Sequence, residues 1–298
     1  MRIFVTGATG FVGSAVVEEL LRSGYQVLGM TRSEKGADAL RAAGADVHYG
    51  ELTDLDSLRA GAAATDGTIH TAFIHDFSKF RENCEIDRKV IGALGDVLAG
   101  SGRPLVVTSG TALVASNEPA TEDMKASVSS DILPRVASEE AADEAAAKGA
   151  RVSIMRLSPS VHGDGDHGFV PHLIALAKEK GVSAYVGSGK NRWPGVHRLD
   201  AARLYRLAVE KNAANARYHA AAEEGVPLRE IATIIGKRLN VPVAGLSDED
   251  AAAHFGWFKH FVSLDAPTSS ETTRAQTGWQ PREIGLLEDI DHERYFAA

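Results

Sequence analysis

The amino-acid sequence predicts an α/β fold in which a doubly wound parallel sheet is joined to a smaller lobe. Three observations predict it. Short apolar runs alternate with amphipathic helical segments over the first 157 residues, a glycine-rich turn joins the first run to the first helix, and later stretches lose the alternation. Each element follows from its own local pattern.

Strands are expected where short apolar runs occur, and helices where apolar residues recur every three or four positions. The predicted strands are residues 3–6, 25–30, 45–48, 68–73, 104–108, 152–157 and 216–220, and the predicted helices are 14–22, 35–43, 55–63, 82–99 and 137–148. Strands that alternate with helices pair in parallel through right-handed crossovers, which places ligands at the carboxyl ends of the strands.

Two stretches, residues 158–194 and 222–298, contain shorter elements punctuated by Gly, Pro and His. We expect them to fold together as a smaller, interleaved C-terminal lobe that binds the substrate. The remaining residues, 1–157 and about 195–221, form the larger domain, because the last predicted strand returns to the sheet.

Composition excludes several classes of protein. The chain has 298 residues, is 44% hydrophobic and carries a formal net charge of -8 without a dense basic run, so a nucleic-acid partner is not expected. No apolar stretch reaches the roughly 18–20 residues that cross a bilayer, and from the first residues we expect no signal peptide. The single cysteine, Cys84, allows no internal disulfide, and zinc-binding spacings are absent. We therefore expect a cytoplasmic protein without a bound metal.

The sharpest motif is Thr6-Gly7-Ala8-Thr9-Gly10-Phe11-Val12-Gly13, between the first strand and the first helix. Gly7 permits the tight turn, Gly10 lets the backbone approach a diphosphate, and Gly13 lets the helix lie close to the strand. The helix start then offers unpaired N–H groups to phosphate. The motif predicts a dinucleotide-binding, Rossmann-type domain.

With its Gly-x-x-Gly-x-x-Gly spacing, the motif resembles the short-chain dehydrogenase/reductase superfamily. The similarity is to the extended and atypical branches, which include nucleotide-sugar epimerases, dehydratases and 3β-hydroxysteroid dehydrogenases. Four further segments resemble family motifs in the right order: residues 50–54, 69–73, 107–111 and 156–163, with residues 196–201 as a late motif. The family's loop over the nicotinamide corresponds to residues 158–163. The resemblance implies that the cofactor contacts Thr6, Gly7, Thr9, Gly10, Phe11, Val12, Gly13, Glu51, Leu52, Thr71, Ala72, Phe73, Thr108, Ser158, Pro159 and Val161.

Cofactor choice follows from charge at the end of the second strand. An acidic residue there binds the ribose 2′-hydroxyl of NAD, whereas an arginine accommodates the 2′-phosphate of NADP. Arg32 and Ser33 occupy this place, with no aspartate beside them. The sequence therefore favours NADP(H) over NAD(H), although Arg32 could also simply end the strand in solvent.

The family's catalytic pair is missing. Members of the superfamily use a Tyr acidified by a Lys four residues later. No Tyr occurs between Tyr49 and Tyr185, and Arg135 and Glu139 stand where the Tyr and the Lys are expected. The usual mechanism cannot be transferred to this chain.

Other residues are candidates for proton transfer and substrate binding. Ser109, Thr111 and His75 are the catalytic candidates, although the two hydroxyls could equally bind cofactor or cap a strand, and His75 could be structural. Trp193 could supply an apolar wall or pack in the core, and Arg198 could anchor an anion. The substrate-binding candidates are Asp76, Arg135, His162, Arg192, Trp193 and Arg198.

Together these features predict an NADP(H)-binding oxidoreductase that transfers hydride to or from a small carbonyl or alcohol, with a non-standard proton donor. Two alternatives stay open. The protein could be an epimerase, isomerase or dehydratase that retains its cofactor, or a non-catalytic NADP(H)-sensing regulator. The expected partner is a small-molecule substrate, and a homodimer through the helices at 82–99 and 137–148 is a family-level expectation.

Overall fold

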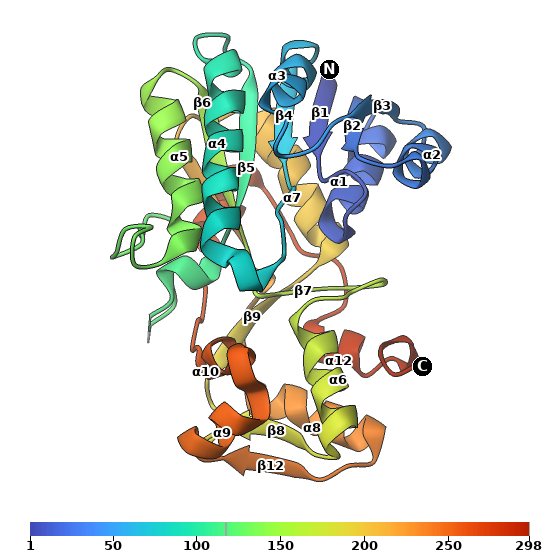
Figure 1. The fold of residues 1–298 in the computed structure, drawn as a ribbon, viewed down its shortest axis with the longest axis vertical. Coiled ribbons are helices and arrows are strands. Elements are labelled where there is room, and N and C mark those ends of the chain that lie inside the picture. The colour runs from blue at the N-terminus through green and yellow to red at the C-terminus, as the bar shows by residue number, and fades with distance from the viewer. Residues whose placement is uncertain (117, 298) are drawn as a thin grey trace.

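The computed structural model describes residues 1–116 and 118–297 and contains a seven-stranded parallel sheet (Figure 1). Its strand order is β10-β6-β5-β4-β1-β2-β3. The strands are β1 (Arg2–Thr6), β2 (Gln26–Thr31), β3 (Asp46–Tyr49), β4 (Gly67–His70), β5 (Pro104–Gly110), β6 (Arg151–Leu157) and β10 (Ala216–Ala220). The predicted doubly wound sheet is confirmed.

Helices cover both faces of this sheet, which buries apolar side chains on each side. Helices α3 (Leu55–Ala63), α4 (Phe80–Leu98) and α5 (Ala137–Ala147) pack on one face, and α1 (Phe11–Arg22), α2 (Glu34–Ala43) and α7 (Arg198–Lys211) on the other. The first core includes Phe4, Leu58 and Leu94, and the second includes Val16, Leu20 and Leu204.

The predicted fourth strand is too long. β4 ends at His70, and Thr71 to Phe73 leave the sheet. On one side the neighbouring strand β1 ends at Thr6, which is paired with His70, whereas on the other side β5 continues to Gly110 without pairing the next residues. Instead the Thr71 hydroxyl donates to the Thr6 carbonyl at 2.7 Å.

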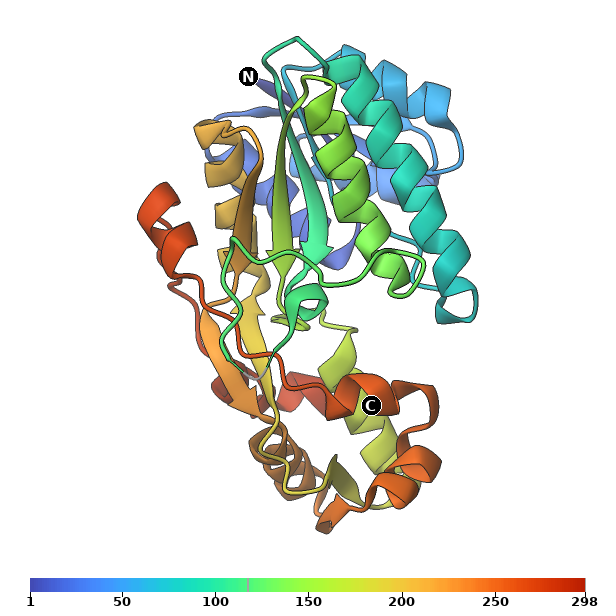
Figure 2. The same ribbon diagram turned by 90° about the vertical axis from the view of Figure 1, so that its left-hand side faces the viewer.

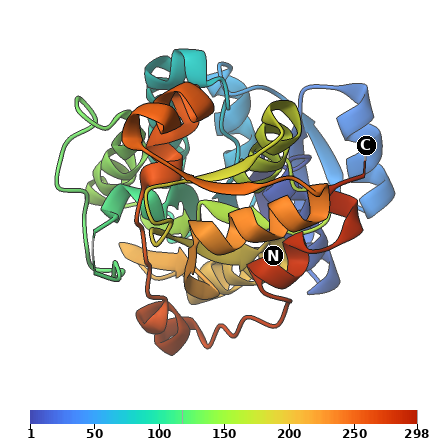
Figure 3. The same ribbon diagram turned by 90° about the horizontal axis from the view of Figure 1, so that it is seen from below.

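A smaller lobe lies beyond the carboxyl ends of the large sheet (Figure 2). One small sheet has the order β11-β9-β7, and β8 pairs with β12. The elements are β7 (Ser160–His162), α6 (Phe169–Lys180), β8 (Ser183–Val186), β9 (Arg192–His197), β11 (Glu223–Pro227), α8 (Leu228–Leu239), β12 (Val243–Leu246), α9 (Asp248–Phe255), η4 (Gly256–Phe258), α10 (Lys259–Ser263), α12 (Leu286–Ile290) and η5 (Glu293–Tyr295). Seen from below, α6, α8 and the α9–α10 segment surround the β8–β12 pair (Figure 3).

The chain returns to the large sheet twice. Helix α7 and strand β10 make the predicted return, and α11 (Glu271–Thr277) makes a second one by packing against both of them. Trp279 follows and lies in the same core as α1 and α7, with only 1% of its surface exposed. Residues 271–279 therefore lie with the large sheet rather than with the lobe, where the sequence places them. None of the helices among the described residues is long and apolar enough to cross a membrane.

The second return is fixed by the buried carboxylate of Asp200. Its Oδ1 accepts the backbone N–H of Arg282 at 2.8 Å and its Oδ2 that of Glu283 at 3.0 Å, and it pairs with Arg203. The Asp200 carbonyl accepts the indole N–H of Trp279 at 2.9 Å.

We expect Asp200→Ala to lower the free energy of unfolding by about 3 kcal/mol, because it leaves two backbone N–H groups without an acceptor and the largely buried guanidinium of Arg203 with Glu283 as its remaining partner. Urea unfolding measures this. The matched control is Asp38→Ala, whose carboxylate pairs with Arg41 on the exposed face of α2 and should not move the urea midpoint. Equal effects of the two substitutions would contradict this assignment.

Candidate functional site

The strand order reverses between β1 and β4, because β1 pairs with β2 on one side and with β4 on the other. In doubly wound sheets, ligands bind outside the carboxyl ends of the strands at such a point. Here Thr6 at the end of β1 lies opposite His70 at the end of β4, and the Thr6 hydroxyl donates to His70 Nδ1 at 2.7 Å. The candidate site is built around this pair.

The glycine turn leaves room that side chains would fill. Gly7 has a φ of +65°, and a Cβ on Gly13 would lie 2.0 Å from the Gly7 carbonyl oxygen. The Gly10 N–H donates to that same oxygen at 2.9 Å. Gly10 then begins helix α1 without a side-chain cap, so the N–H groups of the first turn face an uncovered position. This backbone fits the diphosphate of a dinucleotide.

The other predicted cofactor-binding residues lie along the same edge of the sheet. Those with exposed or partly exposed side chains are Thr9, Phe11, Val12, Arg32, Ser33, Glu51, Leu52, Thr71, Ala72, Phe73, Thr108, Pro159 and Val161. Two others are corrected, because their hydroxyls are buried and bonded within the protein: that of Thr6 to His70, and that of Ser158 to the Ala220 carbonyl at 2.8 Å. The stretch predicted as a loop at residues 158–163 contains strand β7.

Arg135, at the position of the expected Tyr, is held by a buried polar chain. His70 Nε2 donates to Asp87 Oδ1 at 2.9 Å, and the Arg135 guanidinium donates to Asp87 Oδ2 at 2.9 Å. Ser138 also donates to Asp87, and Arg135 donates further to the Thr108 carbonyl at 3.0 Å. The side chain of Arg135 is 18% exposed. Its guanidinium is therefore held in a fixed orientation but remains accessible at the sheet edge.

Asp87 is ionised in this chain of contacts. Burial by itself would raise the pKa of its carboxyl group, but the charge of Arg135 and the hydrogen bonds from His70 and Ser138 hold that pKa below the ordinary value. Because the Asp87 charge balances that of Arg135, the pair can be buried beneath the sheet edge.

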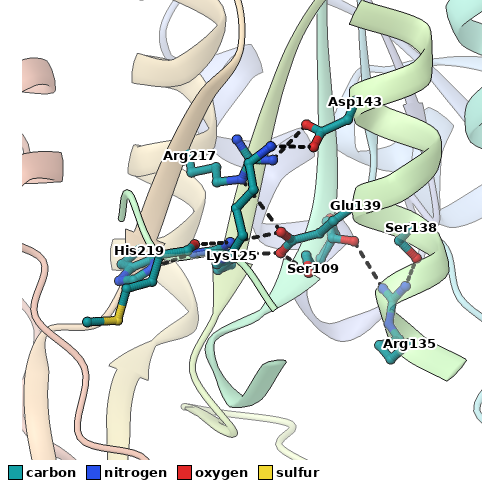
Figure 4. Close-up of polar contacts among 11 residues, drawn as sticks. Ser109, Lys125, Arg135, Ser138, Glu139, Asp143, Arg217 and His219 are labelled. Atoms are coloured by element: carbon teal, nitrogen blue, oxygen red, sulfur yellow. Dashed lines mark hydrogen bonds and ion pairs between the residues drawn. The ribbon is translucent and has the colours of Figure 1, made fainter. Parts of the chain in front are cut away.

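Glu139, at the position of the expected Lys, faces away from Arg135 (Figure 4). Its Oε1 accepts from Ser109 Oγ at 2.7 Å and from Arg156 Nε at 2.8 Å, and Arg217 lies 3.6 Å from its Oε2. Burial would raise the pKa of Glu139, but the hydrogen bond and charge of Arg156 lower it below the ordinary value. The position therefore carries a buried anion instead of a cation.

The structure places the three catalytic candidates in different environments. The predicted catalytic role of Ser109 is corrected, because its hydroxyl is buried and donates to Glu139. Thr111 is fully buried, and its hydroxyl has no partner among the described residues, so it does not reach the surface of the site. His75 is exposed beyond β4, with its ring 5.3 Å from that of Phe73. Of the three, only His75 is open to a substrate.

Three substrate-binding candidates have structural roles in the lobe. Trp193 is 1% exposed and donates its indole N–H to the Phe261 carbonyl, so it is a core residue. His162 is buried and donates to Asp289, and burial lowers its pKa to about 4, so the ring is neutral. Arg192 donates to both oxygens of Asp265, at 3.0 Å and 2.8 Å. These contacts brace the lobe, and the burial of the Trp193 and His162 side chains leaves them no surface for the predicted contacts with substrate.

Two further candidates also differ from expectation. Asp76 caps the short helix η1 (Phe77–Lys79) by accepting from the N–H and the hydroxyl of Ser78. Arg198 donates to Ser14 in the first turn of α1, and its guanidinium lies 5.0 Å from the centre of the Phe11 ring. Arg198 is therefore beside the glycine turn, on the cofactor side of the site.

Sequence reasoning missed Asp87, although its signal is present. Asp87 lies on the stripe of α4 that also carries the buried Cys84, Val90 and Ile91. An acidic residue on an apolar helical stripe indicates a buried, paired carboxylate.

The glycine turn can be tested directly. We expect Gly13→Ala to abolish NADPH binding, because its Cβ cannot fit beside the Gly7 carbonyl without moving the turn. Gly92→Ala is the control, since nothing lies within 4 Å of its Cβ in α4 and alanine favours a helix. Fluorescence titration with NADPH measures both. Retained affinity in Gly13→Ala would overturn the assignment.

Comparison with known proteins agrees with this geometry. An uncharacterized protein of Schizosaccharomyces pombe is 51% identical over 99% of this chain and 100% of its own length. The 2-alkyl-3-oxoalkanoate reductase of Stenotrophomonas maltophilia is 29% identical over 78% of this chain and 73% of its own. The crystal structure of the dTDP-glucose 4,6-dehydratase DesIV from Streptomyces venezuelae shares the fold, with a TM-score of 0.79 and 19% identity over 99% of this chain and 97% of that chain.

A family model described as the NAD dependent epimerase/dehydratase family matches residues 3–221, which include the glycine turn, the switch point and the polar chain to Arg135. The protein belongs to the NAD dependent epimerase/dehydratase family.

Proposed function

We propose that the protein is a cytoplasmic NADP(H)-dependent oxidoreductase that transfers hydride to or from a small carbonyl or alcohol substrate. One observation carries the proposal: the glycine turn lies at the same sheet edge as Arg135 and His75, two groups able to act on a substrate oxygen. The nicotinamide would supply or accept the hydride when the cofactor is bound.

Arg135 suits the stabilisation of charge on that oxygen. A guanidinium stays protonated, so Arg135 cannot replace Tyr as an acid. It can donate hydrogen bonds to an oxygen that becomes negative during reduction. Asp87 and the Thr108 carbonyl fix its orientation before the substrate binds.

His75 suits the transfer of the proton. Desolvation and then the charges of Arg135 and His167 hold its pKa below the ordinary 6.5. The ring is therefore mostly neutral at pH 7, which suits a base in alcohol oxidation, and it becomes an acid for carbonyl reduction as the pH falls.

The preference for NADP(H) rests on Arg32 at the end of β2. Its side chain is exposed, and no hydrogen bond or ion pair engages it within residues 1–116 and 118–297. Ser33 beside it begins α2 and accepts the Gly36 N–H at 3.2 Å. A 2′-phosphate placed here would meet one guanidinium and the start of a helix. Arg198 would reach the diphosphate from the opposite side.

The relative named as a reductase supports net reduction over hydride return, whereas the family name also covers epimerases and dehydratases. The missing Tyr and Lys favour a third role, a non-catalytic NADP(H) sensor. Following NADPH absorbance over a panel of ketones and aldehydes separates these roles. A reductase consumes NADPH, an enzyme that returns hydride converts its substrate without net consumption, and a sensor binds NADPH without turnover.

We expect Arg32→Asp to reverse the cofactor preference, because a carboxylate repels the 2′-phosphate and accepts from the 2′-hydroxyl. Parallel fluorescence titrations with NADPH and NADH measure the ratio of the two dissociation constants. Arg59→Asp, on the outer face of α3, should leave that ratio unchanged. Tighter NADH binding by the wild type would refute the assignment.

We expect His75→Gln to lower the turnover number for carbonyl reduction by about 10²-fold while leaving NADPH affinity intact, as for loss of a proton donor. In the wild type, reduction should speed up as the pH falls through the lowered pKa of His75, since only the protonated ring can donate. The variant should lack this acid limb. His254→Gln on α9 in the lobe is the control, and an unchanged pH profile in His75→Gln would remove His75 from the mechanism.

A further inference from the structure

Aromatic rings join the loop after β4 to the lobe. The Phe77 ring of η1 stacks on the Trp257 ring of η4, with 4.9 Å between centroids and 25° between planes. On its own side Phe77 also stacks on Phe80, at 5.6 Å and 23°. Phe261 of the lobe meets Phe77 edge-on at 6.0 Å. We call Phe77 and Trp257 the aromatic junction.

Trp257 differs from the other two tryptophans. Trp193 and Trp279 are each 1% exposed, whereas Trp257 is 55% exposed. Its indole N–H has no hydrogen-bond partner among the residues that the structure describes. A large ring that is only partly covered, and held by stacking alone, retains surface for another flat group.

The junction is continuous with the groups proposed to act on the substrate oxygen. Phe80 contacts Phe73 at 6.2 Å, and Phe73 contacts His75 at 5.3 Å. The guanidinium of Arg135 lies 4.3 Å above the centre of the Phe73 ring. A chain of ring contacts, stacked at Phe77 and edge-to-face at Phe73, therefore leads from Trp257 to Arg135 and His75.

Two polar side chains along this path, those of Asp76 and Asn83, are already engaged within the protein. Both Asp76 contacts with Ser78 lie within the turn, and Asn83 donates its amide N–H to the Asp76 carbonyl at 2.8 Å. Apart from the imidazoles of His75 and His172, the path thus offers mainly aromatic surface to a ligand rather than donors or acceptors for the hydroxyl groups of a sugar.

We propose that the aromatic junction clamps a flat, aromatic end of the substrate, so that the substrate class is an aryl ketone, an aryl aldehyde or the corresponding alcohol. This rests on the proposed function. Phe77 and Trp257 hold each other in the free protein, and they part to admit the substrate ring between them. Two stacking contacts of about 3.5 Å require the rings to separate to about 7 Å. The carbonyl of the bound substrate then lies toward Arg135 and His75.

The test measures binding without chemistry. Isothermal titration calorimetry of the full chain with saturating NADP⁺ compares acetophenone with cyclohexyl methyl ketone, which has similar size but no flat ring. NADP⁺ cannot reduce either ketone, so the measurement does not depend on turnover. We expect acetophenone to bind at least about 10-fold more tightly, since only a flat ring can stack on two aromatic faces.

Variants locate this preference. Trp257→Ala should weaken acetophenone binding about 10-fold and equalise the two ketones, whereas Trp257→Phe should retain most of the preference. Ile284→Ala, which removes another exposed apolar side chain, is the matched control. Thermal unfolding of each variant confirms that it is folded, as expected for an exposed position.

Three results would overturn the clamp: equal affinity of the wild type for the two ketones, unchanged discrimination in Trp257→Ala, or UDP-glucose binding more tightly than either ketone. Failure of the proposed function, with the clamp intact, gives a different experimental result. In that case acetophenone binds in a manner that depends on Trp257, but NADPH is not consumed when it replaces NADP⁺.

Discussion

The buried carboxylate of Asp87 is the contact on which the geometry of the candidate site depends. One of its oxygens accepts from His70 at the switch point of the sheet, and the other accepts from Arg135 and Ser138 near the start of α5. Through His70 the chain of contacts reaches Thr6 and the glycine turn. A charge buried this deeply must be paired, so the phosphate-binding turn and the position of Arg135 are fixed by one side chain.

The large domain could be predicted because its signals are local. The alternation of apolar runs and helical stripes predicted every strand of the main sheet and five of the six helices that cover it, without α7, and the largest error in a strand boundary was the end of β4. That error has a physical reason: the pairing with β1 stops at His70, and the sequence of residues 68–73 carries no sign of where β1 ends. The return of α11 and Trp279 was missed because it depends on Asp200, about eighty positions away, which binds the backbone of residues 282 and 283.

In the candidate site, too, local features could be predicted from the sequence, whereas contacts between remote residues could not. The glycine turn is contiguous, so its spacing carried the prediction. His162 and Arg192 looked like site residues because their partners, Asp289 and Asp265, are remote in sequence and only the fold brings them together. Arg135 was found through the missing Tyr, but the sequence did not show that Asp87 orients it. The aromatic rings of residues 255–261 look alike in the sequence, and only the structure separates them, with Phe258 buried and Trp257 exposed.

The environment of Glu139 has an evolutionary consequence. Arg156 and Arg217 both neutralise its carboxylate, and Ser109 donates to it, so this position is adapted to a negative charge from three directions. Restoring the family's Tyr and Lys at residues 135 and 139 would place a third cation against two arginines and leave the Asp87 carboxylate without its guanidinium. Residues 135 and 139 are therefore coupled to their surroundings. A lysine at position 139 would fit only if the neighbours on β6 and β10 also lost their charges.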